Sequence, residues 1–289
     1  MKEITILSGK GGTGKTSITA AIASVAENAV YCDNDVDAAD LHLIFKPEIE
    51  QEHIYYGSYI AYIHEDKCTN CGICVDYCRY DAIHVNKNKQ HYINPLQCEG
   101  CRLCERVCPE QAITSEQSKN NHWFVSNTRF GKLVHAKMGA GEENSGKLVS
   151  EIRQKAKTIA KNINAEYVIN DGPPGIGCSA ISSVTGTNTV LLVIEPTLSG
   201  MHDIERVIEL TNSFKIDEVF AVINKFDINL NTVSKIEELL KTKNIPVISK
   251  LPFDKQMVEA MINEQTIVEY SPQSELSEQI RKIWNIIKK

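Results

Sequence analysis

The sequence predicts an α/β domain, with a mostly parallel sheet flanked by helices, that is interrupted by a small cysteine-rich module. Short apolar runs alternate along the chain with longer segments of helical periodicity. A glycine-rich turn joins the first apolar run to the first helical segment. In addition, eight of the ten cysteines fall between residues 68 and 108, where small polar residues replace the apolar pattern.

Strands and helices are expected in alternation from the start of the chain. Residues 4–8 predict a strand, and residues 16–27 predict a helix with an apolar face. Further strands are predicted at residues 29–32, 53–63, 123–127, 133–136, 167–170, 189–194, 219–223 and 247–248. Further helices are predicted at residues 145–162, 201–214 and 231–243. This order indicates βαβ units and hence a parallel sheet.

A last helix is predicted at the C-terminus, where apolar residues recur at helical spacing. They are Leu276, Ile280, Ile283, Trp284 and Ile287. An amphipathic helix at this place either packs on the sheet or lies on a membrane surface. We expect it to pack on the sheet.

Length and composition are those of a globular protein in water. The chain has 289 residues, of which 42% are hydrophobic and 24% charged, and it is long enough to bury a core. The net charge of −6 argues against a dedicated nucleic-acid surface. The first apolar run is too short for a signal peptide, and no run is long enough to cross a membrane. We therefore expect a cytoplasmic protein without a transmembrane segment.

Residues 9–16 read Gly-Lys-Gly-Gly-Thr-Gly-Lys-Thr, which fits the phosphate-loop pattern G-x-x-x-x-G-K-[ST]. Glycines let backbone amides converge on phosphate oxygens, and the helix that follows points its positive end at them. Lys15 is expected to reach the β- and γ-phosphates of ATP, and Thr16 to bind Mg²⁺. The candidate phosphate-binding residues are Gly11, Gly12, Thr13, Gly14, Lys15, Thr16 and Ser17.

A second match to the glycine and lysine spacing occurs at residues 141–148. It lacks the final serine or threonine, and Glu142 and Glu143 would repel phosphate. We interpret it as a loop that caps the helix beginning near Ser145.

Lys10 makes the first loop unusual, and with it the chain resembles the MinD/ParA superfamily of P-loop ATPases, which has a deviant loop of this kind. The resemblance implies that Lys10 reaches the nucleotide of a partner subunit, so that ATP holds a dimer together. It also implies that Asp33 supports the magnesium shell, that Asp35 orients the attacking water, and that Asp171 meets Mg²⁺. The residues that resemble the adenine-binding positions are Asn224 and Pro252.

The mechanism that this resemblance implies is in-line attack of water on the γ-phosphate. Lys10, Lys15 and Mg²⁺ would stabilise the developing negative charge. A loose transition state of this kind needs no strong general base.

The clustered cysteines form two runs of the bacterial two-cluster ferredoxin type, each with the spacing C-x2-C-x2-C-x3-C. The first three cysteines of a run can hold one cubane, and the fourth reaches the other cluster. The predicted ligands are Cys68, Cys71, Cys74 and Cys108 for one [4Fe–4S] cluster and Cys98, Cys101, Cys104 and Cys78 for the other. Zinc is the alternative, but a zinc site needs only four ligands. The second run ends in Cys-Pro, whereas Arg79 follows the first.

The two runs lie thirty residues apart and form an internal repeat, since each is followed by an Ala-Ile pair. We therefore expect three segments: residues 1–63 and 115–289 form the two parts of the P-loop domain, and residues 64–114 form the inserted module. The two cysteines outside it, Cys32 and Cys178, are expected to pack as small core residues. For Cys178 the alternative is a reactive thiol at a helix start.

Taken over nearly its whole length, the chain resembles MinD-type ATPases that contain an inserted ferredoxin domain. The leading hypothesis is ATP-dependent electron transfer, with a redox partner protein and with a dimer formed with itself or with a similar paralogue. A carrier or assembly factor for iron–sulfur clusters is the first alternative. A redox-sensing positioning switch is the second. Binding to nucleic acid is not expected, and peripheral membrane binding is not favoured.

Overall fold

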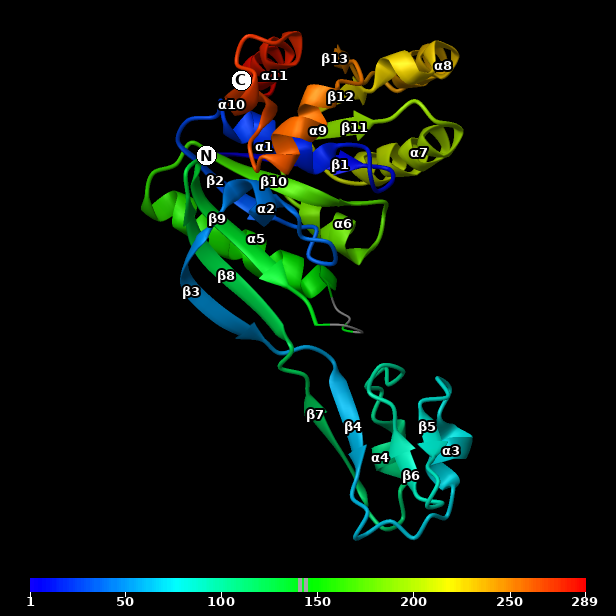
Figure 1. The fold of residues 1–289 in the computed structure, drawn as a ribbon. Helices are drawn as coiled ribbons and strands as arrows, with labels where there is room; N and C mark the ends of the chain where they lie inside the picture. The colour runs from blue at the N-terminus through cyan, green and yellow to red at the C-terminus, as the bar shows by residue number, and fades with distance from the viewer. Residues whose placement is uncertain (140–141, 143–144) are drawn as a thin grey trace. The chain divides into compact units, whose positions relative to one another are not determined.

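The computed structural model describes residues 1–139, 142 and 145–289, and its elements are labelled in Figure 1. Its residues form two compact units. The sheet unit comprises residues 1–52, 123–136 and 145–289. The cysteine unit comprises residues 53–122 and the described residues of 137–144. In the described part of the chain, no helix is long and apolar enough to cross a membrane.

Nine strands of the described chain form one sheet in the order β13-β12-β11-β1-β10-β2-β9-β8-β3. Neighbouring strands run parallel from β13 through β9. The strands are β1 (Lys2–Ser8), β2 (Ala29–Asp33), β3 (Glu48–Tyr55), β8 (Asn121–Thr128), β9 (Gly131–Lys137), β10 (Tyr167–Pro174), β11 (Thr189–Ile194), β12 (Glu218–Asn224) and β13 (Val247–Leu251). The central strands are almost entirely buried, as expected when helices cover both faces.

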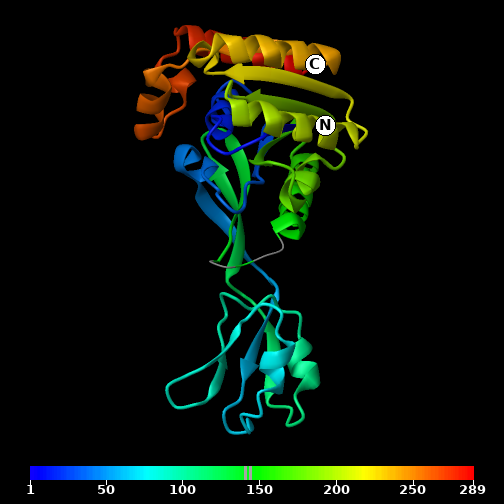
Figure 2. The same cartoon turned by 90° about the vertical axis from the view of Figure 1, so that its right-hand side faces the viewer.

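The helices of the sheet unit are α1 (Lys15–Ala23), α2 (Leu41–Phe45), α5 (Ser145–Asn162), α6 (Cys178–Val184), α7 (Leu198–Asn212), α8 (Leu230–Thr242), α9 (Lys255–Ile262), α10 (Ile267–Tyr270) and α11 (Glu275–Ile287). One apolar cluster joins the sheet to α1 and α11. Another joins it to α7 and α8. Figure 2 shows α7 in yellow-green and α8 in gold, near strands β11 and β12. The predicted α/β architecture with a mostly parallel sheet is therefore confirmed.

The C-terminal helix α11 buries its apolar stripe against this core. All five residues predicted to form the stripe are at most 5% exposed, and the Trp284 ring meets Tyr167 at 4.9 Å between centroids. Because the stripe is covered by the protein itself, the prediction that it packs on the sheet is confirmed.

The single strand predicted at residues 53–63 is wrong, because the chain forms two strands there. Strand β3 ends at Tyr55 and β4 begins at Tyr59, with Gly57 between them. The Gly57 amide donates to the Ser118 carbonyl at 2.9 Å. A side chain at Gly57 would also clash with Asn121. This close approach requires a glycine, which interrupts the apolar pattern.

The cysteine unit repeats its own structure after thirty residues. It contains β4 (Tyr59–Ile63), α3 (Ile73–Tyr77), β5 (Ile83–Val85), β6 (His91–Ile93), α4 (Leu103–Val107) and β7 (Ile113–Gln117). Strand β4 pairs antiparallel with β7, and β5 with β6. The left-handed residues repeat too, in the pairs Asn70 and Gly100, Gly72 and Arg102, and Asp81 and Gln111. The repeat seen in the sequence is therefore a repeat of backbone conformation.

A buried histidine makes the sheet unit sensitive to acid. His135 on β9 is 7% exposed, and its Nε2 lies 3.1 Å from Ser126 Oγ. Its ring stacks with those of Phe124 and His42 at centroid distances of 5.1 and 6.2 Å. Burial, with a further contribution from His42, lowers the pKa of His135 to about 4. The folded chain thus keeps this ring neutral at a pH where an unfolded chain protonates it.

We expect acid to destabilise the protein less when His135 is replaced by glutamine. Between pH 6.5 and about 4, His135 binds a proton in the unfolded state but not in the folded state. The free energy of unfolding therefore falls as the pH falls. From pH 7 to pH 4.5 this loss is roughly 2–3 kcal/mol. Urea denaturation of wild type and His135→Gln at both pH values measures it. Equal losses in the two proteins would contradict the assignment.

Candidate functional site

The phosphate loop connects β1 to α1 and is held from outside by a residue of β12. Gly12 and Gly14 have φ angles of 78° and 88°, a region that glycine adopts without steric cost. Asn224 Nδ2 donates to the Thr13 carbonyl at 2.8 Å. A side chain at Gly14 would collide with that amide group. The glycine and the asparagine together fix the path of the loop.

Lys15 is buried beneath the loop among carboxylates. Its Nζ lies 3.3 Å from Asp171 Oδ1 and 3.5 Å from Asp35 Oδ2. Burial acts to lower the pKa of Lys15, but Asp171, Asp35 and Asp33 outweigh it and the pKa is raised. The lysine is therefore fully charged and available to a polyanion.

Asp171 on β10 is aligned by two hydroxyl groups of α1. Thr16 Oγ1 donates to Asp171 Oδ2 at 2.7 Å, and Thr19 Oγ1 donates to Asp171 Oδ1 at 2.8 Å. A hydroxyl and a carboxylate side by side are oxygen ligands of the kind that Mg²⁺ takes. The structure thus brings Thr16 and Asp171 together, as their predicted roles require.

The two carboxylates after β2 occupy different environments. Asp33 is completely buried and accepts the amides of Asp35 and Leu41, both at 3.2 Å. Burial, followed by the charge of Asp171, raises its pKa well above the usual range. Asp35 lines the cavity above, and burial raises its pKa to about 6 against the opposing effect of Lys15. Asp35 is therefore the one placed to meet a ligand, with Asp33 supporting the turn behind it.

Lys10 is directed onto its own chain. Its Nζ donates to Thr197 Oγ1 at 2.9 Å and lies 3.8 Å from Glu195 Oε2. Glu195 also attracts Lys225, whose Nζ is 3.7 Å away and donates to the Gly12 carbonyl at 3.2 Å. The turn between β11 and α7 therefore holds the two lysines that flank the phosphate loop.

A cavity of about 580 Å³ opens above these groups, a size that suits a nucleotide. Its polar floor contains residues 10–17 and Asp35. One wall is apolar and consists of Phe253, Met257, Val258 and Met261. Asn224 lines the cavity, but of the described residues Phe253 takes the place predicted for Pro252. The sequence signal that could have found this wall is the apolar spacing within α9, directly after Pro252.

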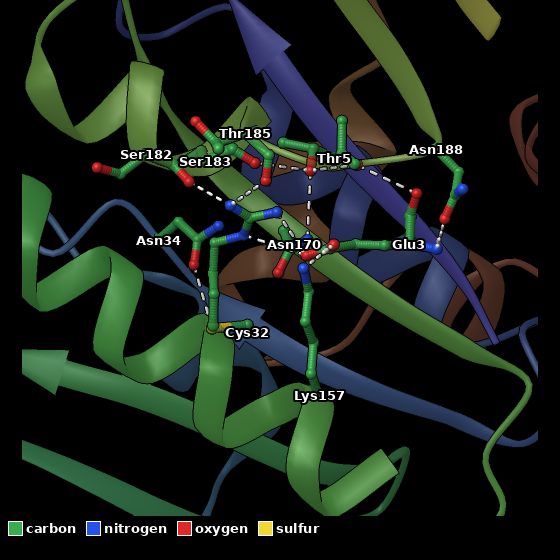
Figure 3. A network of polar contacts seen from close by, with 12 residues as sticks. Glu3, Thr5, Cys32, Asn34, Lys157, Asn170, Ser182, Ser183, Thr185 and Asn188 are labelled. Atoms are coloured by element: carbon green, nitrogen blue, oxygen red, sulfur yellow. Dashed lines mark hydrogen bonds and ion pairs between the residues drawn. The ribbon is translucent and has the colours of Figure 1, made fainter. Parts of the chain in front are cut away.

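A buried ion cluster lies behind the site, and Figure 3 shows Glu3, Lys157 and Asn170 converging. Glu3 Oε1 is 2.6 Å from Arg153 Nη2 and accepts from Asn170 Nδ2 at 3.0 Å. Glu3 Oε2 is 2.6 Å from Lys157 Nζ. Arg153 also donates to the Thr185 carbonyl at 3.1 Å. Because Asn170 directly precedes Asp171, this cluster ties α5 and the end of α6 to the strand that carries Asp171.

The structure collects the eight clustered cysteines into two groups of four. Cys68, Cys71, Cys74 and Cys108 line one cavity. Cys78, Cys98, Cys101 and Cys104 line another. Each group takes three cysteines from one run and the fourth from the other. Among the described residues, no three His, Cys, Asp or Glu side chains are arranged to hold a single metal ion.

Burial raises the pKa of two thiols in these groups, with neighbouring cysteines adding to the effect. The pKa of Cys74 is raised, and that of Cys104 rises to about 11. Bringing these thiols together therefore disfavours their thiolate form, which is the form that binds metal.

The two remaining cysteines differ from each other. Cys32 on β2 is fully buried, as predicted. The prediction that Cys178 packs in the core is wrong, since its side chain is exposed. It is the first residue of α6, and Gly146 of α5 packs against its Cβ and backbone. The second glycine–lysine match lies partly outside the described residues, which resume with α5 at Ser145.

The phosphate loop, the converging carboxylates and the parallel sheet define a P-loop nucleotide-binding protein. Residues 4–267 match the family described as the CobQ/CobB/MinD/ParA nucleotide binding domain, and the chain belongs to this family. The resemblance drawn from Lys10 and the aspartates is thereby confirmed at the level of the family.

Individual relatives agree with this family. An uncharacterized protein of Methanocaldococcus jannaschii is 34% identical over 99% of this chain and 96% of its own length. The septum site-determining protein MinD of Synechocystis is 24% identical over 88% of this chain and 77% of its own. The solved cell division ATPase MinD of Pyrococcus furiosus has a TM-score of 0.57 at 18% identity and covers 99% of this chain and 98% of its own. MinD of Pyrococcus horikoshii, solved with Mg-ADP, has a TM-score of 0.56 at 16% identity and covers 100% and 96%.

Proposed function

We propose that this protein binds and hydrolyses ATP with Mg²⁺, and that it couples ATP-driven dimerisation to electron transfer through two [4Fe–4S] clusters. The observation that carries the proposal is the coexistence, in one chain, of a full set of P-loop residues and two separate four-cysteine cavities. Family membership supports the nucleotide half of the proposal. The cysteine geometry supports the other half.

The donor set of each cavity fits a cubane. Four thiols surround each cavity, and a cubane offers four iron corners, each of which takes one thiolate. A cubane holds its ligands further apart than a single ion does. Eight cysteines in two such runs favour clusters over zinc, because a zinc site needs only four ligands. When bound, such clusters carry single electrons.

In the nucleotide cavity, each proposed role falls to a residue of suitable chemistry. The amides of residues 11–17 bind the phosphates, and Lys15 exchanges a carboxylate partner for the β- and γ-phosphates. Thr16 and Asp171 hold Mg²⁺, which neutralises charge on the phosphates when bound. Asp35 orients the attacking water from the cavity floor, and Asp33 supports the turn.

Adenine lies against the apolar wall in this proposal. Asn224 lines the cavity near the loop, while Phe253 and the α9 residues offer an apolar surface for the base. Pro252 contributes to the adenine site in this proposal only indirectly, because it directly precedes Phe253 in the chain. Phe253 is 49% exposed, so its aromatic ring is available to stack on a purine.

Lys10 is the residue that links ATP binding to dimerisation in this proposal. Its contacts with Thr197 and Glu195 are exchanged for the γ-phosphate of a partner subunit, which is either a second copy or a similar paralogue. A cation supplied in trans to a transferring phosphoryl group stabilises the transition state. A redox partner protein then donates electrons to the cysteine unit or accepts them from it.

The test compares steady-state ATPase rates of anaerobically purified protein with its clusters oxidised and with them reduced by dithionite. We expect a several-fold change in rate, because coupling makes hydrolysis depend on the redox state. The Lys15→Ala variant provides the background rate, with and without dithionite. An unchanged wild-type rate would count against electron transfer. It would favour a cluster carrier, for which the exposed thiols of Cys71 and Cys101 provide an exit.

A further inference from the structure

The two cysteine cavities are built from positions that correspond across the thirty-residue repeat, so the differences between them can be identified directly. Ile63 lines the first cavity and Ile93 lines the second. Ile113 and Ile83 form the matching pair on the other side. These isoleucines match between the two repeats, so differences at other lining positions can be compared directly.

The clearest difference is that Gly72 lines the first cavity where Arg102 lines the second. Both are left-handed, with φ angles of 79° and 61°. That conformation suits glycine but strains an arginine. Such a conformation persists only when the surroundings hold the residue in place.

Two contacts hold Arg102. Its guanidinium carbon lies 4.7 Å from the centre of the Tyr59 ring. Its Nε and Nη2 donate to the carboxylate of Glu105 at 2.9 and 3.2 Å. Thirty residues after Tyr59 the chain has Lys89 in place of an aromatic ring, so the first cavity has no counterpart to this arrangement. The arginine is thus fixed at one site only.

The polar residues that line the two cavities differ at this position and at another, since His91 lines the first cavity where Ala61 lines the second. Each cavity has one glutamate in its lining, Glu110 in the first and Glu99 in the second. Arg102 adds a cation to the second, and among the described residues Glu105, its ion-pair partner, is not part of that lining. Arg102 is therefore the member of the pair that lines the cavity of the cysteines.

We propose that Arg102 raises the reduction potential of a cluster bound by Cys78, Cys98, Cys101 and Cys104 above that of the cluster at the other site. An incoming electron would then reduce the cluster beside Arg102 first. This inference rests on the proposed function, because it requires a cluster at each site. Reduction by a low-potential one-electron donor protein, [4Fe–4S]²⁺ + e⁻ → [4Fe–4S]⁺, adds a negative charge that a fixed neighbouring cation stabilises. In this proposal Arg102 contributes a positive charge at a fixed place and is not a ligand of the cluster.

The experiment is a redox titration of the full chain, loaded anaerobically with both clusters and followed by electron paramagnetic resonance. Wild type is expected to show two midpoint potentials. Arg102→Gly restores the glycine of the other repeat and relieves the backbone strain, and it is expected to lower the higher potential alone. Arg102→Lys keeps the charge and is expected to keep most of the separation. Arg106→Gln removes an exposed charge from α4, the helix that follows Arg102, and both potentials are expected to stay unchanged.

Cys101→Ser assigns the signals, since it is expected to alter or remove the higher-potential component and leave the other. A single midpoint potential in wild type would overturn the inference. So would equal shifts of both potentials, or no shift, in Arg102→Gly, or a loss of the lower component in Cys101→Ser. Iron content separates this from the proposed function. An iron content well below about eight atoms per loaded chain would overturn the proposed function itself. A full iron content, with potentials that Arg102→Gly leaves unaltered, would overturn only the role of Arg102.

Discussion

Replacing Glu3 with glutamine is expected to destabilise the sheet unit by about 3–5 kcal/mol, because it removes the anion from a buried ion cluster. The side chains of Glu3 and Arg153 are only 3% and 5% exposed, so Arg153 cannot turn to water for compensation. Lys157 is 25% exposed and can reach solvent more easily. The uncompensated charge of Arg153 therefore accounts for most of the loss.

Urea denaturation followed by tryptophan fluorescence measures this effect, since the two tryptophans of the chain, Trp123 and Trp284, both belong to the sheet unit. The matched control is Glu218→Gln, which breaks an ion pair between Glu218 and Lys2. The Glu218 side chain is 43% exposed in that pair. The control is expected to cost less than about 1 kcal/mol. Equal effects of the two variants would show that Glu3 does not act as a buried counterion.

Replacing Lys10 with alanine is expected to lower kcat for ATP hydrolysis by roughly 10³-fold, as for other cations supplied in trans to a phosphoryl group. Affinity for the nucleotide is expected to change much less, because Lys15 and the loop amides remain. Phosphate release at saturating ATP measures kcat. Equilibrium titration with a non-hydrolysable analogue measures affinity, and light scattering with the same analogue measures dimer formation.

Lys225→Ala is the matched control for this variant, because both lysines lie within 4 Å of Glu195. Lys225 contacts its own phosphate loop, so its loss is expected to reduce affinity modestly without preventing dimers. If the two variants lowered kcat equally and both remained able to dimerise, Lys10 would act within its own subunit. The proposed role in trans would then be wrong.

Local patterns were sufficient where the apolar spacing is uninterrupted. Helix α5 occupies residues 145–162 as predicted, since its apolar spacing is uninterrupted. Strand β10 extends from Tyr167 to Pro174, four residues beyond the predicted end. The extension pairs with β1, where Ser8 faces Pro174. Pairing between strands that are distant in sequence cannot be seen in the apolar pattern of one of them.

The chemistry of the phosphate loop was also predictable, because it depends on residues that are close together in sequence. The residues that hold it in place were not. Glu3 appears in the sequence as an ordinary polar residue of a strand, and its partner Arg153 comes 150 residues later. Thr197 meets Lys10 across a comparable gap. Such contacts depend on the fold as a whole.

Each repeat of the cysteine unit contributes three cysteines to one cavity and one cysteine to the other. A lone repeat would therefore have three cysteines for one cavity and a fourth that belongs to the other. It could complete a site only by exchanging that fourth cysteine with a second copy of itself. Because one chain holds both repeats, the two halves need not be identical, and they differ at Gly72 and Arg102.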